Sequence, residues 1–311
     1  MIAHLKGRER ALEAFGWTGR EAEWIALVCL HSGVFTRDQI RDWLEIHRHT
    51  ARRFVQDILD RRLGAEDALE GRRVCRIAAR AVYRALGAEN IRHRRIASPV
   101  VLMRRLLSLD YVIGHAGQAW LPTEPEKVAA FEALGLDRRV LPGRAYRGAA
   151  GDIRRYFPLK LPVALDAGRA VFVYADPGHD TATALHSWGR VHRELWEGLQ
   201  ERGRKVEAVA VVRTDSEFDR AEKVLGNWTD PARSPGRAKG SATGREIRRE
   251  IERIEQGIRG RDKLVIGRYG SLRGCLVRLA ELRSALPAAP SEAMIDDFAV
   301  WRSARLPGDP F

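Results

Sequence analysis

Residues 18–63 carry an apolar pattern that constrains the fold of this chain more than any other feature of its sequence. Thr18 and Glu21 have the spacing of a helix-capping box, and the apolar residues that follow recur at helical intervals. A second capping residue, Thr36, opens a shorter helix, and we expect a third helix from Thr50 to Leu63. Three short helices with a tight joint between the last two are typical of a helix-turn-helix.

The third of these helices decides whether the motif reads DNA. Its apolar residues form one stripe, which we expect to pack on the first two helices. The opposite side carries polar and basic residues near the N-terminus: Arg48, His49, Thr50, Arg52, Arg53 and Gln56. In helix-turn-helix proteins this end of the second motif helix meets base edges, where Arg can bond guanine and Gln can bond adenine. The alternative is a solvated basic face on an ordinary three-helix bundle.

Residues 64–78 predict a β-hairpin after the third helix, with an acidic turn over 66–71. Such a wing would bring three arginines to a phosphate backbone: Arg72, Arg73 and Arg76. A further basic run contains Arg92, Arg94 and Arg95. The sequence therefore predicts a winged helix-turn-helix DNA-binding domain, with a helical extension, over residues 1–118.

Ser98 and Pro99 open the helix of that extension, because Pro suits the first helical position. Its apolar stripe consists of Val101, Leu102, Leu106, Leu109 and Val112. A stripe this apolar packs either within the domain or against a second copy of the chain. A homodimer formed through this helix is therefore one of the expected partner states.

The second half of the chain has the pattern of a small α/β domain over residues 151–228, which residues 119–150 connect to the first. Two buried strands are expected at 170–175 and 206–212. A helix follows each of them, at 181–202 and at 216–228. This order predicts a parallel pair of strands joined by a crossover. The overall class is α+β or α/β.

The remaining sequence is more polar. Residues 229–244 are rich in Pro, Gly and basic residues, which is typical of a basic linker. Residues 245–311 predict a C-terminal helical extension, with a charged helix over 245–260 and a second helix over 272–286. Residues 264–266 predict a short strand between them, and we expect the Pro-rich end to lie across the surface.

Composition narrows the class of partner. The chain has 311 residues and a formal net charge of +13, which favours a polyanion because basic groups release counterions condensed on phosphates. Arginine-rich codon usage is the alternative explanation, since only 7 of the 54 basic residues are Lys. The sequence has no apolar run of roughly 18 residues, no secretory signal and no close cysteine pair. These features predict a soluble cytoplasmic protein without a membrane partner.

The end of the first buried strand carries a family resemblance. It reads Tyr174-Ala175-Asp176-Pro177-Gly178-His179-Asp180-Thr181. A winged helix-turn-helix followed by this α/β segment resembles the replication-relaxation family of bacterial plasmid and mobile-element proteins, over about residues 15–228. The resemblance implies a second domain similar to the restriction-endonuclease-like fold, with Asp176 at its second acidic position and Gly178 and Thr181 at the following turn.

The chain departs from that family's pattern at the other active-site positions. Tyr174 stands in place of the first acid, Val163 in place of an Asp, and Trp188 near the place of a Lys. Metal-assisted phosphodiester hydrolysis needs carboxylates that hold Mg²⁺ and orient a water. The resemblance therefore implies a degenerate site with no catalytic residue and no cofactor. The alternative is a nuclease that uses Asp176 with Mg²⁺ or Mn²⁺.

A different metal set is also possible at this strand-to-helix junction. Asp176, His179 and Asp180 lie close together in the sequence, and His with carboxylate suits several divalent transition metals. The more ordinary interpretation is that Asp180 or Thr181 caps the following helix and that the histidines are surface groups.

The sequence thus predicts a sequence-preferring, double-stranded DNA-binding protein of a bacterial or mobile genetic element, acting in transcription or replication control. The α/β domain would serve oligomerisation or bind a protein partner. A protein-interaction module that uses the winged helix as a scaffold and binds no DNA is a further alternative.

Overall fold

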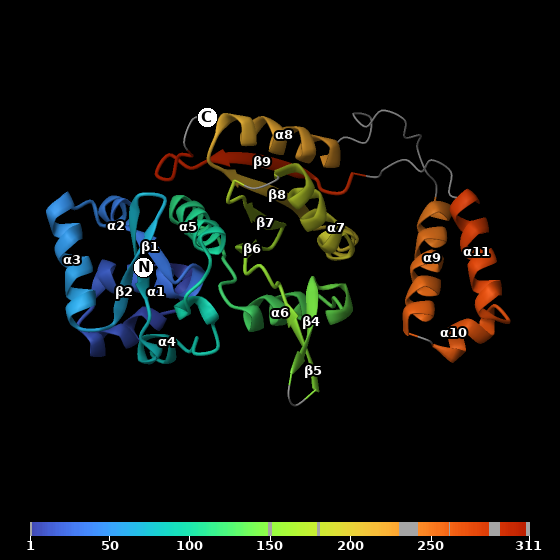
Figure 1. The fold of residues 1–311 in the computed structure, drawn as a ribbon, viewed down its shortest axis with the longest axis horizontal. Coiled ribbons are helices and arrows are strands. Elements are labelled where there is room, and N and C mark those ends of the chain that lie inside the picture. The colour runs from blue at the N-terminus through green and yellow to red at the C-terminus, as the bar shows by residue number, and fades with distance from the viewer. Residues whose placement is uncertain are drawn as a thin grey trace. The chain divides into compact units, whose positions relative to one another are not determined.

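The computed structural model is a mixed α+β structure. It describes residues 2–148, 151–178, 181–229, 242–260, 262–285 and 293–308. The chain forms two compact units (Figure 1). Unit 1 spans Met1–Leu225 and Ile295–Phe311, and unit 2 spans Gly226–Met294.

The three predicted N-terminal helices are present in unit 1, after two short 3₁₀ helices. The elements are η1 (Ala3–Leu5), η2 (Arg8–Phe15), α1 (Gly19–His31), α2 (Arg37–Leu44) and α3 (Arg48–Asp60). Thr36 caps α2 in a complete capping box with Gln39. Thr18 precedes α1 without a side-chain cap bond, so the box expected with Glu21 does not form.

A three-stranded antiparallel sheet accompanies these helices. Its strands are β1 (Val34–Thr36), β2 (Gly64–Leu69) and β3 (Arg72–Ile77), in the order β1-β3-β2. The two-residue turn Glu70-Gly71 has φ angles of 47° and 71°, as the tight turns that join twisted strands require. Glu66 and Asp67 therefore lie on β2, and the expected acidic turn over 66–71 is wrong.

The second sheet of unit 1 contains the predicted parallel strands. Its elements are β6 (Val163–Leu165), β7 (Arg169–Ala175), α7 (Thr181–Gln200), β8 (Lys205–Val212), α8 (Asp215–Thr229) and β9 (Asp297–Arg302). The strand order is β6-β7-β8-β9, with β6 antiparallel to β7 and the other three strands parallel. The parallel pair and the two following helices are confirmed.

Strand β9 was not predicted, and it brings the end of the chain back to this sheet. It pairs with β8 from Glu207↔Asp297 to Val212↔Arg302. The expectation that the C-terminal end crosses the surface is therefore wrong, and this end belongs to unit 1 rather than to a helical extension. Because β9 lies at the sheet edge and its apolar residues are half-buried, it needs no continuous apolar run.

Helix α5 (Pro99–Gly114) joins the two halves of unit 1. It follows α4 (Arg80–Ala85) and η3 (Arg92–Arg94), and it contacts α1 and β1 as well as β7 and β8. Leu102, Leu106, Leu109 and Val112 are buried in these contacts. The stripe considered for dimerisation therefore lies mostly inside the chain, and a homodimer would have to use another surface.

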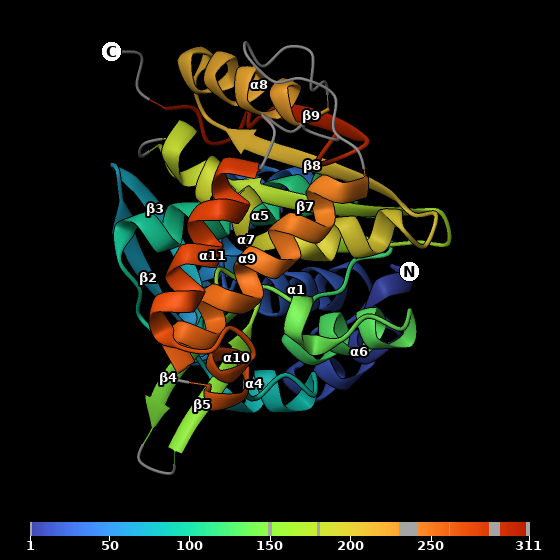
Figure 2. The ribbon, with the colours of Figure 1, turned by 90° about the vertical axis from the view of Figure 1, so that its right-hand side faces the viewer.

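Residues 119–150, expected as a connecting segment, contain regular structure. Thr123 caps α6 (Glu124–Ala133) in a capping box with Glu126, and η4 (Arg138–Val140) follows. Strands β4 (Gly143–Gly148) and β5 (Gly151–Tyr156) then form an antiparallel hairpin. Both ribbon views show this hairpin extending away from the body of unit 1 (Figure 2).

Unit 2 is helical. Its helices α9 (Ala242–Gly260), α10 (Lys263–Arg268) and α11 (Leu272–Ala285) surround a small core of Ile254, Cys275, Leu279 and Leu282. The strand expected at 264–266 is wrong, because Asp262 caps α10 by accepting from the backbone N–H of Leu264. Most of the expected linker over 229–244 lies outside the described residues.

Candidate nucleic-acid interface

Helix α3 is docked through one side and open on the other. Ala51, Val55 and Ile58 are fully buried, and the helix contacts α2 and β2. The side chains exposed to solvent are Arg48, His49, Arg52, Arg53 and Gln56, and Thr50 is half-buried. The structure therefore leaves the predicted reading side of this helix uncovered within unit 1.

The arginines of α3 differ from those of α2 in their partners. Arg37 of α2 bonds Glu66 at 2.6 Å, and Arg41 forms ion pairs of 2.9 Å with both Asp38 and Asp42. Within the described residues, by contrast, the guanidinium groups exposed on α3 form no ion pair or hydrogen bond (Arg48, Arg52 and Arg53). Their charge is available to a partner.

The N-terminus of α3 places cations where a helix favours anions. His47, the N-cap residue, makes no side-chain cap bond, and the first turn contains no acidic residue. Arg48 and the free backbone N–H groups of this turn add to the positive end of the helix dipole. This arrangement is unfavourable by itself and becomes favourable when an anion such as a phosphate approaches.

The positive surface of α3 is limited to its first two turns. Asp57 pairs with Arg61 at 3.1 Å, and Gln56 donates to the Asp60 carboxylate at 2.8 Å. The acidic groups of the last turns would repel a phosphate backbone that ran along the whole helix. The charge distribution therefore favours an approach in which the N-terminal end of α3 points at the polyanion.

The wing arginines are less available than the sequence suggested. Arg76 is 7% exposed, bonds Asp67 at 2.9 Å and donates to the Arg94 carbonyl at 3.1 Å. It is therefore a structural residue and not a candidate for phosphate contact. The physical reason is that β3 is the central strand of its sheet, so both of its faces are covered away from the turn.

The tip of the wing is held by the second half of unit 1. Arg213 forms an ion pair of 2.5 Å with Glu70 at the turn, and Arg72 donates to the Pro307 carbonyl at 3.0 Å. Arg73 bonds Glu66 at 2.7 Å but keeps a side chain that is 70% exposed. Of the three predicted wing arginines, Arg73 is the one that projects into solvent.

The residues of the basic run after the wing differ in their exposure to solvent. Arg92 and Arg95 are exposed, whereas Arg94 is half-buried and His93 is buried. A Cβ on Gly33, which has a φ of 77°, would meet the His93 Cβ at 2.5 Å, so this glycine permits the close approach. Two of the three predicted arginines in the run therefore face solvent.

The described residues include only part of the predicted metal site. Asp176 is fully buried at the end of β7, and its carboxylate accepts from the Gly178 N–H at 2.9 Å. His179 and Asp180 lie outside the described residues. Across the ranges that the structure describes, no three His, Cys, Asp or Glu side chains could hold a metal ion together.

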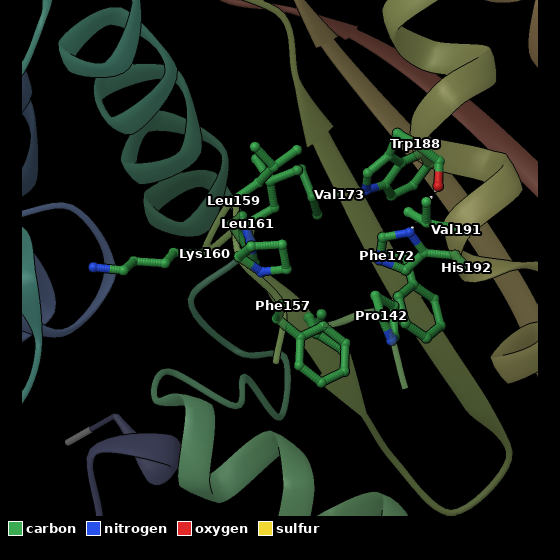
Figure 3. Close-up of a pocket in the computed structure, with 13 residues that line it drawn as sticks. Pro142, Phe157, Leu159, Lys160, Leu161, Phe172, Val173, Trp188, Val191 and His192 are labelled. Carbon is green, nitrogen blue, oxygen red and sulfur yellow. Dashed lines mark hydrogen bonds between the residues drawn. The ribbon is translucent and has the colours of Figure 1, made fainter. Parts of the chain in front are cut away.

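A second feature of unit 1 is an apolar pocket between α7 and the segment that follows β5 (Figure 3). Phe157, Phe172, Trp188 and His192 contribute rings to it. Burial lowers the pKa of His192 to about 4, and its Nδ1 lies 2.8 Å from the Trp188 carbonyl. The side chain of Lys160 points away from the pocket in Figure 3. The lining suits packing against an apolar group rather than acid–base chemistry.

The β4–β5 hairpin was missed in the sequence. It exposes Arg144, Arg147, Arg154 and Arg155 together with Tyr146. The sequence signal for it is a run of arginines and aromatic residues that follows Gly143.

In comparisons with known proteins, this chain matches no family model, no curated protein and no solved structure. The function is therefore inferred from the side chains of the site and their surroundings. Guanidinium groups and a helix N-terminus are donors suited to phosphates and to the acceptor edges of bases. No helix in the described part of the chain has the length and apolar character needed to cross a membrane.

Proposed function

We propose that this protein is a sequence-preferring, double-stranded DNA-binding protein in which α3 enters the major groove. The observation that carries the proposal is the group of exposed arginines on the first two turns of α3, which have no acidic partner within the described residues. On the neighbouring helix α2, by contrast, both arginines form ion pairs with acidic side chains. The unpaired group is therefore most useful as a polyanion contact.

The proposed fold of this part is a winged helix-turn-helix. The order α1-β1-α2-α3-β2-β3, with β3 between the other two strands, supports it. In this geometry the N-terminal residues of the second motif helix meet base edges. Arg52 and Arg53 would read guanine, while Arg48, His49 and the N–H groups of the first turn would hold phosphates.

The α/β half of unit 1 would fix the orientation of the DNA-binding half and offer a surface to a protein partner. The contacts of Arg213 with Glu70 and of Arg72 with Pro307 support the first role. We further propose that the protein acts in transcription or replication control of a bacterial or mobile genetic element, as a relative of the replication-relaxation family would.

The proposal is tested by measuring binding of duplexes selected from a random pool. The Arg52→Ala/Arg53→Ala variant should lose about 1–3 kcal/mol of binding free energy for each true base contact and discriminate less between selected and random duplexes. Fluorescence anisotropy titrations at several salt concentrations measure both effects.

The matched control is Arg80→Ala/Arg84→Ala on α4, which changes the net charge equally but removes arginines that pair with Glu89. Equal binding by both double variants and the parent would refute the assignment of α3. Absence of any salt-dependent duplex binding by the parent would refute DNA binding altogether and favour the protein-interaction module.

A further inference from the structure

The β4–β5 hairpin is a second place where unit 1 gathers exposed arginines. Residues 143–156 contain four arginines and one aspartate. Arg144, Arg147 and Arg154 are exposed and form no ion pair within the part of the chain that the structure describes. Arg155, at the base, lies 3.9 Å from Glu124 of α6. The hairpin therefore carries a concentrated positive charge.

The strand register distributes these side chains over both faces of the hairpin. One face presents the cross-strand pairs Arg144–Arg155 and Tyr146–Ile153. The other face presents Arg154 and Arg147, and Arg147 is the register partner of Asp152. Each face thus combines positive charge with an apolar or aromatic group, since Tyr156 lies on the same face as Arg154.

This arrangement lowers the stability of the hairpin. Two arginines directly opposite each other repel, and Tyr146 and Ile153 remain 43% and 47% exposed. A two-stranded hairpin is marginally stable even without such repulsion. The guanidinium groups of Arg144 and Arg154 lie over the rings of Tyr146 and Tyr156 at 5.5 and 5.6 Å, which offsets part of the cost. A partner that neutralises the arginines would offset the rest.

The base of the hairpin is firmly held. The Tyr156 N–H donates to Glu124 at 2.8 Å, and the Phe157 N–H donates to the Pro142 carbonyl at 2.7 Å. The buried ring of Phe157 stacks on Phe131 of α6 at 5.8 Å. These contacts hold the base of the hairpin against α6, and Figure 2 shows its ribbon extending away from the rest of unit 1.

We propose that the β4–β5 hairpin is a second DNA-binding arm, which inserts into a groove of duplex DNA. The major groove admits a two-stranded ribbon, and its depth of about 8.5 Å is less than the roughly 20 Å spanned by six-residue strands. Arginines on both faces suit a ribbon that enters between two phosphate backbones. Tyr146 and Ile153 supply apolar contacts to sugars and base edges. This proposal rests on the proposed function of the protein.

The test uses the full chain and a random duplex of about 30 base pairs, or three helical turns. In the triple variant Arg144→Ala/Arg147→Ala/Arg154→Ala, the slope of log Kd against log salt concentration should fall by about 2–3. Each lost phosphate contact removes about 0.9 from that slope. Affinity should fall about tenfold or more at the lower salt concentrations. The corresponding triple Lys variant should restore most of the slope, because it keeps the charge.

The matched control removes three exposed arginines elsewhere in unit 1, Arg10, Arg190 and Arg220, and it changes the net charge equally. Thermal unfolding of both triple variants checks that the fold is intact. If the hairpin variant binds duplex DNA as the control does, with an equal salt slope, the arm is refuted.

The outcomes separate this inference from the proposed function. Weaker binding by the α3 variant together with unchanged binding by the hairpin variant refutes the arm and leaves the function standing. A parent that binds no duplex refutes both. Sedimentation with phosphatidylglycerol vesicles is a further arm of the experiment. If the hairpin variant loses vesicle binding while its DNA binding is unchanged, the hairpin is a lipid contact and the DNA-binding arm is refuted.

Discussion

Buried histidines are the most unusual residues of unit 1. His4, His31, His93 and His192 are all less than 9% exposed. Burial lowers the pKa of His4 and His192 to about 4 and lowers the pKa values of the other two well below the usual 6.5. The Nε2 atoms of His4 and His31 lie 3.3 Å apart, a geometry that suits one neutral donor and one neutral acceptor. The folded state therefore holds neutral imidazoles in its core.

These histidines predict a loss of stability in mild acid. As the pH falls below about 6.5, the unfolded chain takes up protons that the folded chain does not, so the free energy of unfolding decreases. Each histidine contributes up to about 1.4 kcal/mol per pH unit. Urea denaturation between about pH 7 and about pH 5.5 measures the effect. Above pH 7 this contribution is fully present.

The His192→Phe variant is the companion measurement, because its neighbours Phe172 and Trp196 are aromatic. It should show a shallower dependence of stability on pH than the parent does. A parent whose free energy of unfolding is constant over this range would contradict the assignment of neutral buried histidines.

The wing, β2–β3, is the element whose tertiary contacts matter most for the proposed function. The Glu70-Gly71 turn forms the tip of this hairpin. Here the tip is bonded to Arg213 and to the segment after β9. The β2–β3 hairpin therefore connects the N-terminal half of unit 1 with its α/β half, and α3 keeps three exposed arginines that form no ion pair within the described residues.

The Glu70→Ala variant should loosen this connection without unfolding the chain. The pair it removes is partly exposed on the Glu70 side, so the free energy of unfolding should fall by about 1 kcal/mol or less. Amide hydrogen exchange in peptides that cover residues 64–78 should become faster. Glu89→Ala, which removes another acid of unit 1 that pairs with arginine, is the control. Equal exchange in the two variants would show that Arg213 does not hold the wing.

Across unit 1 as a whole, the segment after β9 is bonded to helices of the N-terminal half. Asp110 of α5 is fully buried and accepts from Ser303 at 2.6 Å and from Arg305 at 3.0 Å. Arg305 also bonds Asp42 of α2 at 2.7 Å. Arg305 thus bonds side chains of both α2 and α5.

The Arg305→Ala variant should destabilise unit 1 by about 1–3 kcal/mol, because the buried Asp110 carboxylate loses a hydrogen-bond donor and keeps the one from Ser303. Arg302→Ala is the matched control, since Arg302 pairs with Asp215 on the surface, where both side chains are more than half exposed. The control should cost about 0.5 kcal/mol or less. Urea denaturation measures the free energy of unfolding of both variants. Equal losses of stability would contradict a special role for the bonds of Arg305.

The elements with local sequence signals were predictable without a structure. The helices near residues 19–60, the hairpin at 64–77, the parallel strands β7 and β8 and their helices follow from periodicity, caps and turn residues. The exposed basic side of α3 follows in the same way, because a helix with one apolar stripe turns its other side to solvent. The reading side of the candidate site was therefore predictable.

Which charged side chains are exposed and which are paired inside the fold could not be predicted from the sequence. Arg73 and Arg76 look alike in the sequence, yet one projects into solvent and the other is buried against Asp67. The pairing of β9 with β8 joins residues about 90 positions apart, and the contacts of the wing join residues still farther apart. No local sequence signal exists for such contacts. Contacts between segments distant in the chain select partners for side chains, and a pattern read along the chain contains no information about that choice.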